Sequence, residues 1–159
     1  MIYLDNNATT MIAPEVFEAM KPYLTEKYWN PSSMYEPAVE LSKEIRTARK
    51  TIARHLGATS SQEVIFTSCA TESNNAAIFG AVRAHPERRH IITTKVEHPA
   101  VLEVCKELQR QGYSITWLDV DQNGNLDLAQ FVQAIQPDKT LMVSIMHANN
   151  ETGVIFPIE

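Results

Sequence analysis

Apolar residues recur every three or four positions in the first third of the chain, a spacing typical of helices with one buried face. The clearest example covers residues 38–56, and Gly57 follows it as a helix stop. A shorter helix is predicted to carry Pro14 in its first turn and to run to about Leu24. The pattern therefore predicts that residues 1–62 form an N-terminal segment with two helices.

From residue 63 the pattern changes to short apolar segments that alternate with helical ones. Strands are predicted at residues 63–67, 90–94, 114–118 and 140–146, and helices at residues 71–84, 99–111 and 127–135. The last predicted strand is almost uniformly apolar, which is typical of a strand buried on both faces. This alternation predicts an α/β domain over residues 63–159, with a mainly parallel sheet and helical crossovers.

Net charge and composition argue against several classes of protein. The 159 residues carry a net charge of -5, which argues against non-specific binding to nucleic acid or to an anionic membrane. No apolar run approaches the roughly 18 residues of a spanning helix, and residues 1–5 lack the pattern of a signal peptide. Two cysteines, Cys69 and Cys105, do not make a disulfide framework. We therefore expect a cytoplasmic protein.

Polar residues follow three of the predicted strands, at the edge where open α/β sheets bind ligands. The turn after the first strand leads into a helix whose N–H groups could bind a phosphate, or could simply be capped by Ser68 or Thr71. His98 could stack on a flat ring and move protons, or could merely mark a helix start. Asn149 and Asn150 could form a turn or donate amide hydrogen bonds. Three such loops at one edge favour a shared pocket.

The order and spacing of these segments resemble those of the cysteine desulfurases, which are class V aminotransferases of pyridoxal-phosphate (PLP) fold type I. The likeness is carried by residues 3–10, 30–33, 66–68 with 70–73, 97–98, and 144–147 with 149–151 and Gly153. It covers essentially the whole chain, and it implies the N-terminal part of a PLP-binding large domain. It also implies the family reaction, in which L-cysteine becomes L-alanine and its sulfur passes to an enzyme cysteine as a persulfide, for iron–sulfur cluster or nitrogenase assembly.

The resemblance also implies roles for individual residues. Ala70 and Thr71 would bind the cofactor phosphate, and His98 would stack on the pyridine ring and assist proton transfers. Asn150 would form hydrogen bonds near the ring hydroxyl and the substrate, with Asn149 holding the loop. Residues 7–9 would lie by the pocket mouth or at a dimer contact.

Family members hold PLP through a lysine that lies later in their sequences than the part this chain matches. The sulfur-accepting cysteine, an aspartate for the pyridinium nitrogen and an arginine for the substrate also lie in that later part. Lys95 is the nearest candidate, but we expect it to be a solvated lysine at a strand end. The chain is therefore expected to be an N-terminal fragment, inactive alone, which self-associates or pairs with a complementary C-terminal segment. A sulfur acceptor or scaffold protein would be a further partner. The alternative is a non-catalytic scaffold derived from the same fold.

Several residues depart from the family pattern. Cys69 stands where glycine is usual, and we expect it to be small and buried, while Cys105 should belong to the core. Trp29 replaces a common glycine and Tyr35 a common histidine, which puts normal substrate handling in doubt.

One rival interpretation is a calcium site. Residues 119–124 match the start of an EF-hand loop, but Gln130 stands at the twelfth position in place of the bidentate glutamate. An acidic turn that contains Gly124 is the better account. We therefore expect no metal site.

Overall fold

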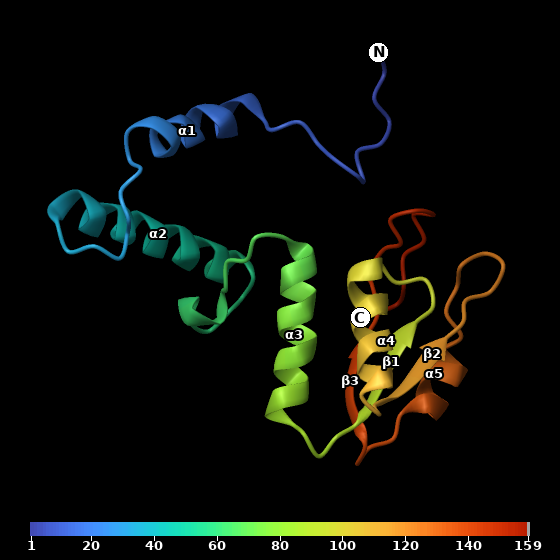
Figure 1. Cartoon of the computed structure of the whole chain (residues 1–159). Helices are drawn as coiled ribbons and strands as arrows, with labels where there is room; N and C mark the ends of the chain where they lie inside the picture. Colours follow the sequence, from blue (N-terminus) through green and yellow to red (C-terminus); the bar gives the residue numbers. More distant parts are fainter. Residues whose placement is uncertain (159) are drawn as a thin grey trace. The chain divides into compact units, whose positions relative to one another are not determined.

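The structure is a computed structural model in which residues 1–158 are described (Figure 1). The chain divides into two compact units, Met1–Phe66 and Thr67–Glu159. This boundary lies slightly later than the predicted one at residue 62. The first unit is helical, and the strands of the described residues all belong to the second. None of the helices within residues 1–158 is both long and apolar enough to cross a membrane.

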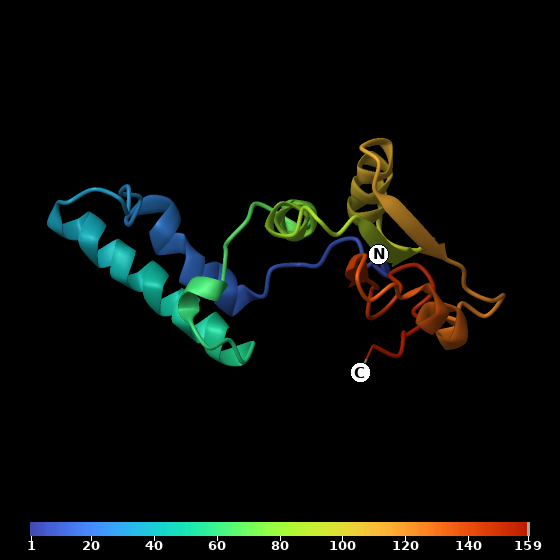
Figure 2. The same ribbon diagram turned by 90° about the horizontal axis from the view of Figure 1, so that it is seen from below.

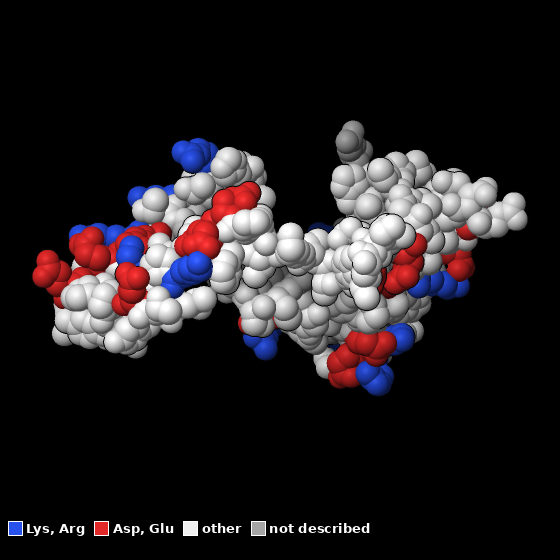
Figure 3. All heavy atoms as spheres, turned by 90° about the horizontal axis from the view of Figure 1, so that it is seen from above, with Lys and Arg blue, Asp and Glu red and all other residues white. Residues whose placement is uncertain are grey.

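The N-terminal unit contains both of the helices predicted for it. Helix α1 spans Pro14–Thr25 and α2 spans Glu36–His55. Buried residues of α2 are Ala38, Leu41 and Ala53, which lie on the predicted apolar stripe. Figure 3 shows Lys and Arg mixed with Asp and Glu over one face of this unit, so neither sign of charge dominates there.

Polar contacts join the two helices of this unit. The Lys27 ammonium lies 2.6 Å from the Glu44 carboxylate, which also accepts a 2.7 Å hydrogen bond from the Tyr23 hydroxyl. In the connecting loop, the Asn30 side chain and carbonyl accept hydrogen bonds from the following backbone, as expected for a turn. Trp29 stacks against the neighbouring Tyr28 ring. Its bulk is therefore accommodated beside that turn.

The prediction of a strand at residues 63–67 is wrong. Ser61–Glu63 forms a short 3₁₀ helix (η1), and residues 64–67 lie outside any strand. The Arg49 guanidinium donates to the Val64 carbonyl and lies over the Phe66 ring at 4.7 Å from its centroid. A strand needs a hydrogen-bonded neighbour, and here an arginine side chain takes the backbone acceptor instead. The residue types at positions 63–67 favoured a strand, but a strand forms only where a neighbouring strand is available to pair with it.

The second unit is built on a parallel sheet, as predicted. Strands β1 (His90–Thr94), β2 (Ser114–Leu118) and β3 (Thr140–Ser144) lie in the order β2-β1-β3. Ile91 of β1 is aligned with Ile115 of β2 and with Met142 of β3. Parallel neighbours require crossover connections, and helices provide them here. The α/β fold class is therefore confirmed.

Three helices cover this sheet on its two faces. Helices α3 (Ala70–Ala84) and α4 (Pro99–Arg110) lie on one face, and α5 (Leu128–Ala134) lies on the other (Figure 2). Because parallel crossovers are right-handed and the chain reverses direction across β1, successive crossover helices must lie on opposite faces. The main core forms between α3, α4 and the sheet. Its buried members are Ile78, Ile91, Val101, Val104, Cys105 and Leu108.

The last strand is less buried than its composition predicts. β3 ends at Ser144 rather than residue 146, and Val143 is 41% exposed. β3 lies at an edge of the described sheet, and the seven-residue α5 contacts β2. An apolar run therefore marks a strand here without guaranteeing burial on both faces.

The segment that resembles an EF-hand loop is the predicted acidic turn. The Asp121 carboxylate accepts hydrogen bonds from the backbone N–H groups of Asn123 and Asn125, and Gly124 has a φ of +84°. These bonds use the carboxylate that a cation would need. Within residues 1–158, no group of three His, Cys, Asp or Glu side chains is arranged to hold a metal ion.

His90 joins all three strands through its imidazole ring. The side chain is 2% exposed, and its Nδ1 and Nε2 lie 2.8 Å from the hydroxyls of Thr140 and Thr116. Burial lowers the pKa of the ring below its ordinary value. A neutral imidazole can donate through one nitrogen and accept through the other, which matches a pair of hydroxyl partners.

This environment predicts acid-sensitive stability. Because the folded pKa lies below the unfolded value of about 6.5, the unfolded chain binds a proton more readily. The contribution of His90 is therefore present above about pH 6.5 and is lost as the pH falls through the folded pKa. We expect His90→Gln to show a weaker loss of urea stability between neutral and mildly acidic pH. An unchanged pH slope in that variant would contradict the role of His90.

Candidate functional site

The N-terminus of α3 offers backbone N–H donors at the candidate phosphate turn. Cys69 is the N-cap residue, and no side-chain hydrogen bond caps the helix there, so capping by Ser68 or Thr71 is not observed. The first N–H groups of a helix have no acceptor within it, and they lie at the positive end of the helix dipole. The Glu72 carboxylate turns back to accept from the Ser68 N–H and hydroxyl, each at 2.7 Å.

His98 begins α4 and has a defined ring orientation. Its Nδ1 accepts a 3.1 Å hydrogen bond from the Ala100 N–H, so the side chain caps the helix. In a neutral ring that accepts at Nδ1, the proton is on Nε2. The ring itself is exposed, with Pro99 following it in the first turn. His98 thus combines the helix-entry role and an accessible imidazole.

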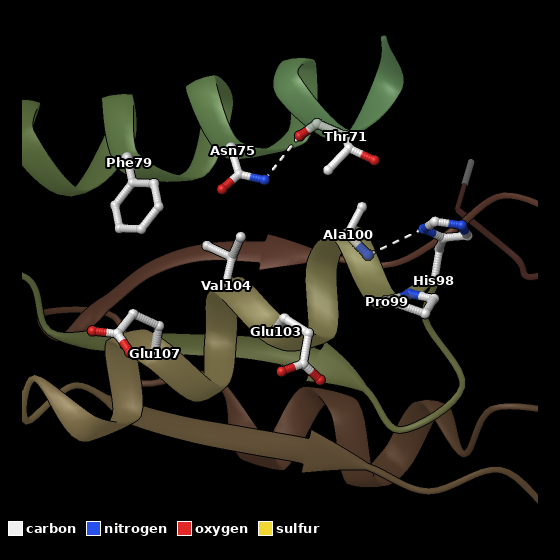
Figure 4. Close-up of a pocket in the computed structure, with 9 residues that line it drawn as sticks. All are labelled: Thr71, Asn75, Phe79, His98, Pro99, Ala100, Glu103, Val104 and Glu107. Carbon is white, nitrogen blue, oxygen red and sulfur yellow. Dashed lines mark hydrogen bonds between the residues drawn. The ribbon is translucent and has the colours of Figure 1, made fainter.

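A cavity of about 420 Å³ between α3 and α4 brings Thr71 and His98 together. Both lie toward the same end of it, while Phe79 and Glu107 lie toward the other (Figure 4). The Asn75 amide, one turn along α3, donates to the Thr71 carbonyl over 2.8 Å. The lining residues are Thr71, Asn75, Phe79, His98, Pro99, Ala100, Glu103, Val104 and Glu107.

The other two candidate site residues occupy different positions. Ala70 is exposed as the first residue of α3, directly before Thr71. Asn150 is exposed in the loop after β3, where its amide donates to the Glu151 carboxylate over 3.1 Å, and it is not among the residues that line the cavity. Thus two of the three predicted loops meet at this cavity, and the third does not reach it.

Asn149 holds the loop after β3. Its side chain is 7% exposed, and its Oδ1 accepts hydrogen bonds from the N–H groups of Glu151 and Thr152. Its Nδ2 donates to the Val96 carbonyl over 3.1 Å. Asn149 therefore shapes its own turn and also joins that turn to the loop that precedes His98.

Sequence reasoning missed Glu97 as a structural element of the site. Its carboxylate is buried and accepts hydrogen bonds from the Thr94 hydroxyl at 3.0 Å and the Met146 N–H at 2.8 Å. Burial raises the pKa of this carboxyl, and the Met146 and Thr94 hydrogen bonds oppose the rise. The signal available in the sequence was an acidic residue directly before His98, at the end of an apolar strand.

The helical part of the cavity lining was also missed. Thr71, Asn75 and Phe79 are spaced by four along α3, and Glu103 and Glu107 are spaced in the same way along α4. Residues four apart share one face of a helix. The spacing could have indicated two facing rows, but the pairing of the two helices is a tertiary feature.

Lys95 is the solvated strand-end lysine that we predicted. Its ammonium is exposed and lies 2.7 Å from the Asp119 carboxylate, just beyond β2. A reactive lysine needs a desolvated amine, which this position does not provide.

The two cysteines have opposite environments. Cys69 is exposed, so the expectation that it is buried is wrong. The Glu72 N–H and the Ser68 hydroxyl lower the pKa of its thiol. Cys105 is fully buried as predicted, and burial raises the pKa of its thiol to about 11. The position at a helix terminus, rather than residue size, decides the exposure of Cys69.

This contrast predicts selective alkylation. At neutral pH, iodoacetamide should modify Cys69 and leave Cys105 intact, because the thiolate is the reactive form. Mass spectrometry of the intact chain should show a single adduct, and a second should appear in urea. Equal labelling of both thiols in the folded chain would contradict the buried position of Cys105.

Comparisons with known proteins agree in pointing to one group of enzymes. The sequence model described as "Aminotransferase class-V" matches residues 2–159. A cysteine desulfurase of Trichormus azollae is 58% identical over 159 residues, which are 100% of this chain and 39% of that protein. The cysteine desulfurase NifS of Azotobacter vinelandii is 46% identical over 158 residues, which are 99% of this chain and 39% of the relative.

Solved structures give the same answer for the fold. A structure titled "NIFS-LIKE PROTEIN" superposes with a TM-score of 0.92 at 41% identity, covering 98% of this chain and 43% of that one. Another, titled "SspA in complex with cysteine", has a TM-score of 0.91 at 38% identity and covers 100% of this chain and 46% of that one. The chain therefore spans less than half the length of these relatives.

Proposed function

Because the chain belongs to the class-V aminotransferase family, and is similar to cysteine desulfurases along its whole length, we propose that it is the N-terminal portion of a PLP-dependent cysteine desulfurase. In this proposal it supplies the phosphate-binding turn and the ring-stacking histidine. The chain spans 39% of the length of the Trichormus azollae relative. We propose that the complete reaction also needs residues outside it.

The observation that carries the proposal is the shared cavity of Thr71 and His98. Thr71, in the first turn of α3, lies at one end of this cavity, and no side-chain hydrogen bond caps the helix. A helix N-terminus with a hydroxyl beside it suits a phosphate. The exposed His98 imidazole provides a flat face for a pyridine ring. The Glu72 carboxylate is turned back toward Ser68, where the Ser68 N–H and hydroxyl hold it.

The family is PLP-dependent, and these residues fit that cofactor. Ala70 and Thr71 would hold its phosphate, and His98 would orient its ring and move a proton through Nε2. When bound, PLP supplies an electron sink for bond cleavage at the amino acid. Asn150 stays a proposed contact to the ring hydroxyl, and it would have to approach from the loop after β3.

The proposed overall reaction transfers sulfur from L-cysteine to an enzyme thiol. L-Cysteine and the thiol give L-alanine and a persulfide, so the carbon–sulfur bond breaks and a sulfur–sulfur bond forms. We propose that the 159-residue chain alone does not complete this reaction, because Lys95 is solvated and paired with Asp119. A sulfur acceptor, a second copy or a complementary segment would be its partners, in a reducing cytoplasm.

The test uses a phosphorylated ring that cannot react with surface lysines. 4′-Deoxypyridoxine 5′-phosphate lacks the aldehyde of PLP, so its saturable binding reports the pocket rather than amine chemistry. We expect Thr71→Val to weaken binding roughly tenfold through loss of a hydrogen bond to a charged group. Thr47→Val on α2, in the other unit, is the matched control and should bind as the wild type does.

The outcomes separate this proposal from the alternative of a non-catalytic scaffold. Competition by inorganic phosphate and weaker binding of unphosphorylated 4′-deoxypyridoxine would support the phosphate turn. Absence of saturable binding, or equal affinity of the Thr71→Val variant, would count against the cofactor site and would leave the scaffold as the better account.

A further inference from the structure

We propose that Glu97 is a positioning residue for His98, an inference that rests on the proposed function. Its buried carboxylate ties the end of β1 to the loop after β3. The backbone that carries His98 is thereby held at the cavity beside Thr71. Neither the reaction nor the comparisons assign Glu97 a role.

Two hydrogen bonds join the two loops at this point, and a third ties Glu97 to the end of β1. Glu97 is 7% exposed, and its Oε1 accepts from the Met146 N–H at 2.8 Å and from the Thr94 hydroxyl at 3.0 Å. The Asn149 amide adds a 3.1 Å bond to the Val96 carbonyl. Donors from β1 and from the loop after β3 therefore converge on residues 96 and 97, immediately before His98.

This anchoring matters because the His98 ring lies at the surface. Its Nδ1 is bonded to the Ala100 N–H within its own helix, which fixes the ring relative to α4. That bond does not fix the His98 ring relative to the carboxyl edge of the sheet. The Glu97 carboxylate makes this second connection, one residue away along the chain.

Hydrogen bonding rather than charge is the essential property in this arrangement. Both donors reach the same oxygen, Oε1, and a glutamine side chain has a carbonyl oxygen in that place with two lone pairs. Burial raises the pKa of Glu97, while the hydrogen bonds from Met146 and Thr94 oppose the rise. Glutamine should therefore replace glutamate well, whereas alanine leaves the Met146 N–H without its acceptor.

The experiment compares Glu97→Gln with Glu97→Ala in two independent readouts. The first is the affinity for 4′-deoxypyridoxine 5′-phosphate. The second is the set of ¹⁵N and ¹H chemical shifts of the His98 ring without ligand, which respond to the position of the ring relative to its surroundings. We expect Glu97→Gln to stay within about twofold of the wild-type affinity and Glu97→Ala to lose roughly tenfold, with altered His98 signals.

A milder variant keeps the test decisive if Glu97→Ala does not fold. Thr94→Val preserves the shape of a fully buried β-branched side chain and removes one of the two donors to Glu97. It should weaken binding about threefold and shift the His98 signals in the same direction. Unchanged affinity and unchanged His98 signals in the folded variants would overturn the inference. Equal damage from Gln and Ala would also overturn it.

The two readouts distinguish failure of this inference from failure of the proposed function. If the wild type does not bind the phosphorylated ring, the cofactor site is wrong. The His98 spectrum then still decides whether Glu97 holds the imidazole, because it is recorded without ligand.

Discussion

Replacement of Leu108 by alanine is expected to lower the free energy of unfolding of the sheet-containing unit by about 3 kcal/mol. Leu108 is fully buried on α4 and belongs to the core between α3, α4 and the sheet. Such a change removes apolar contacts and leaves a cavity that the close-packed neighbours fill poorly. Because the whole stability of a small domain is about 5–15 kcal/mol, this loss would be large.

Urea denaturation followed by tryptophan fluorescence measures this effect. Trp117 of β2 is packed against the same core, and Trp29→Phe removes the second tryptophan, which belongs to the other unit. Leu128→Ala is the matched control, since Leu128 is 49% exposed at the start of α5. It should change stability by less than about 1 kcal/mol. Similar losses in both leucine variants would contradict the assigned core.

Replacement of His98 by asparagine is expected to weaken the binding of 4′-deoxypyridoxine 5′-phosphate roughly tenfold. Ring-on-ring packing of this kind contributes about 0.5–1.5 kcal/mol beyond the burial of apolar area. Asparagine removes the ring but keeps an oxygen that can accept from the Ala100 N–H, so the cap of α4 should survive. Affinity should therefore fall while the unfolding midpoint changes little.

His85→Asn provides the control for this variant. His85 is an exposed histidine at the C-terminal end of α3, where it lies 3.5 Å from Glu87, and it is not among the residues that line the cavity. Its replacement should leave the affinity unchanged. Loss of affinity in His85→Asn, or none in His98→Asn, would argue that the phosphorylated ring binds elsewhere.

The sequence determined most of the local structure and the family. Pro14 marked the start of α1, and the apolar pattern predicted α2, α4 and three of the strands close to their observed bounds, because helices and strands repeat with different periods. The order of the motifs indicated the class-V aminotransferase family, which the match over residues 2–159 shows. These features depend on neighbouring residues or on the order of motifs along the chain, so the amino-acid sequence is enough to reveal them.

Pairing and exposure were decided by the tertiary structure. Residues 64–67 have the composition of a strand, yet the Arg49 side chain takes their first carbonyl, and strand formation depends on a neighbour that composition does not specify. Cys69 was expected to be buried, but its place at the N-terminus of α3 leaves it exposed. The burial of β3 likewise follows from its place at a sheet edge.

The candidate site divides in the same way. The sequence indicated Thr71 and His98 through the resemblance to cysteine desulfurases, while their positions alone also allowed simple helix caps. The packing of α3, α4 and the loop after β3 decided the rest. It places Thr71 and His98 in one cavity, leaves Asn150 outside the cavity lining, and lets Glu97 join two loops beside His98. Met146 and Glu97 lie 49 positions apart in the sequence, and only folding brings them within hydrogen-bond distance. Neither the composition nor the hydrophobic periodicity of the chain indicates such a contact.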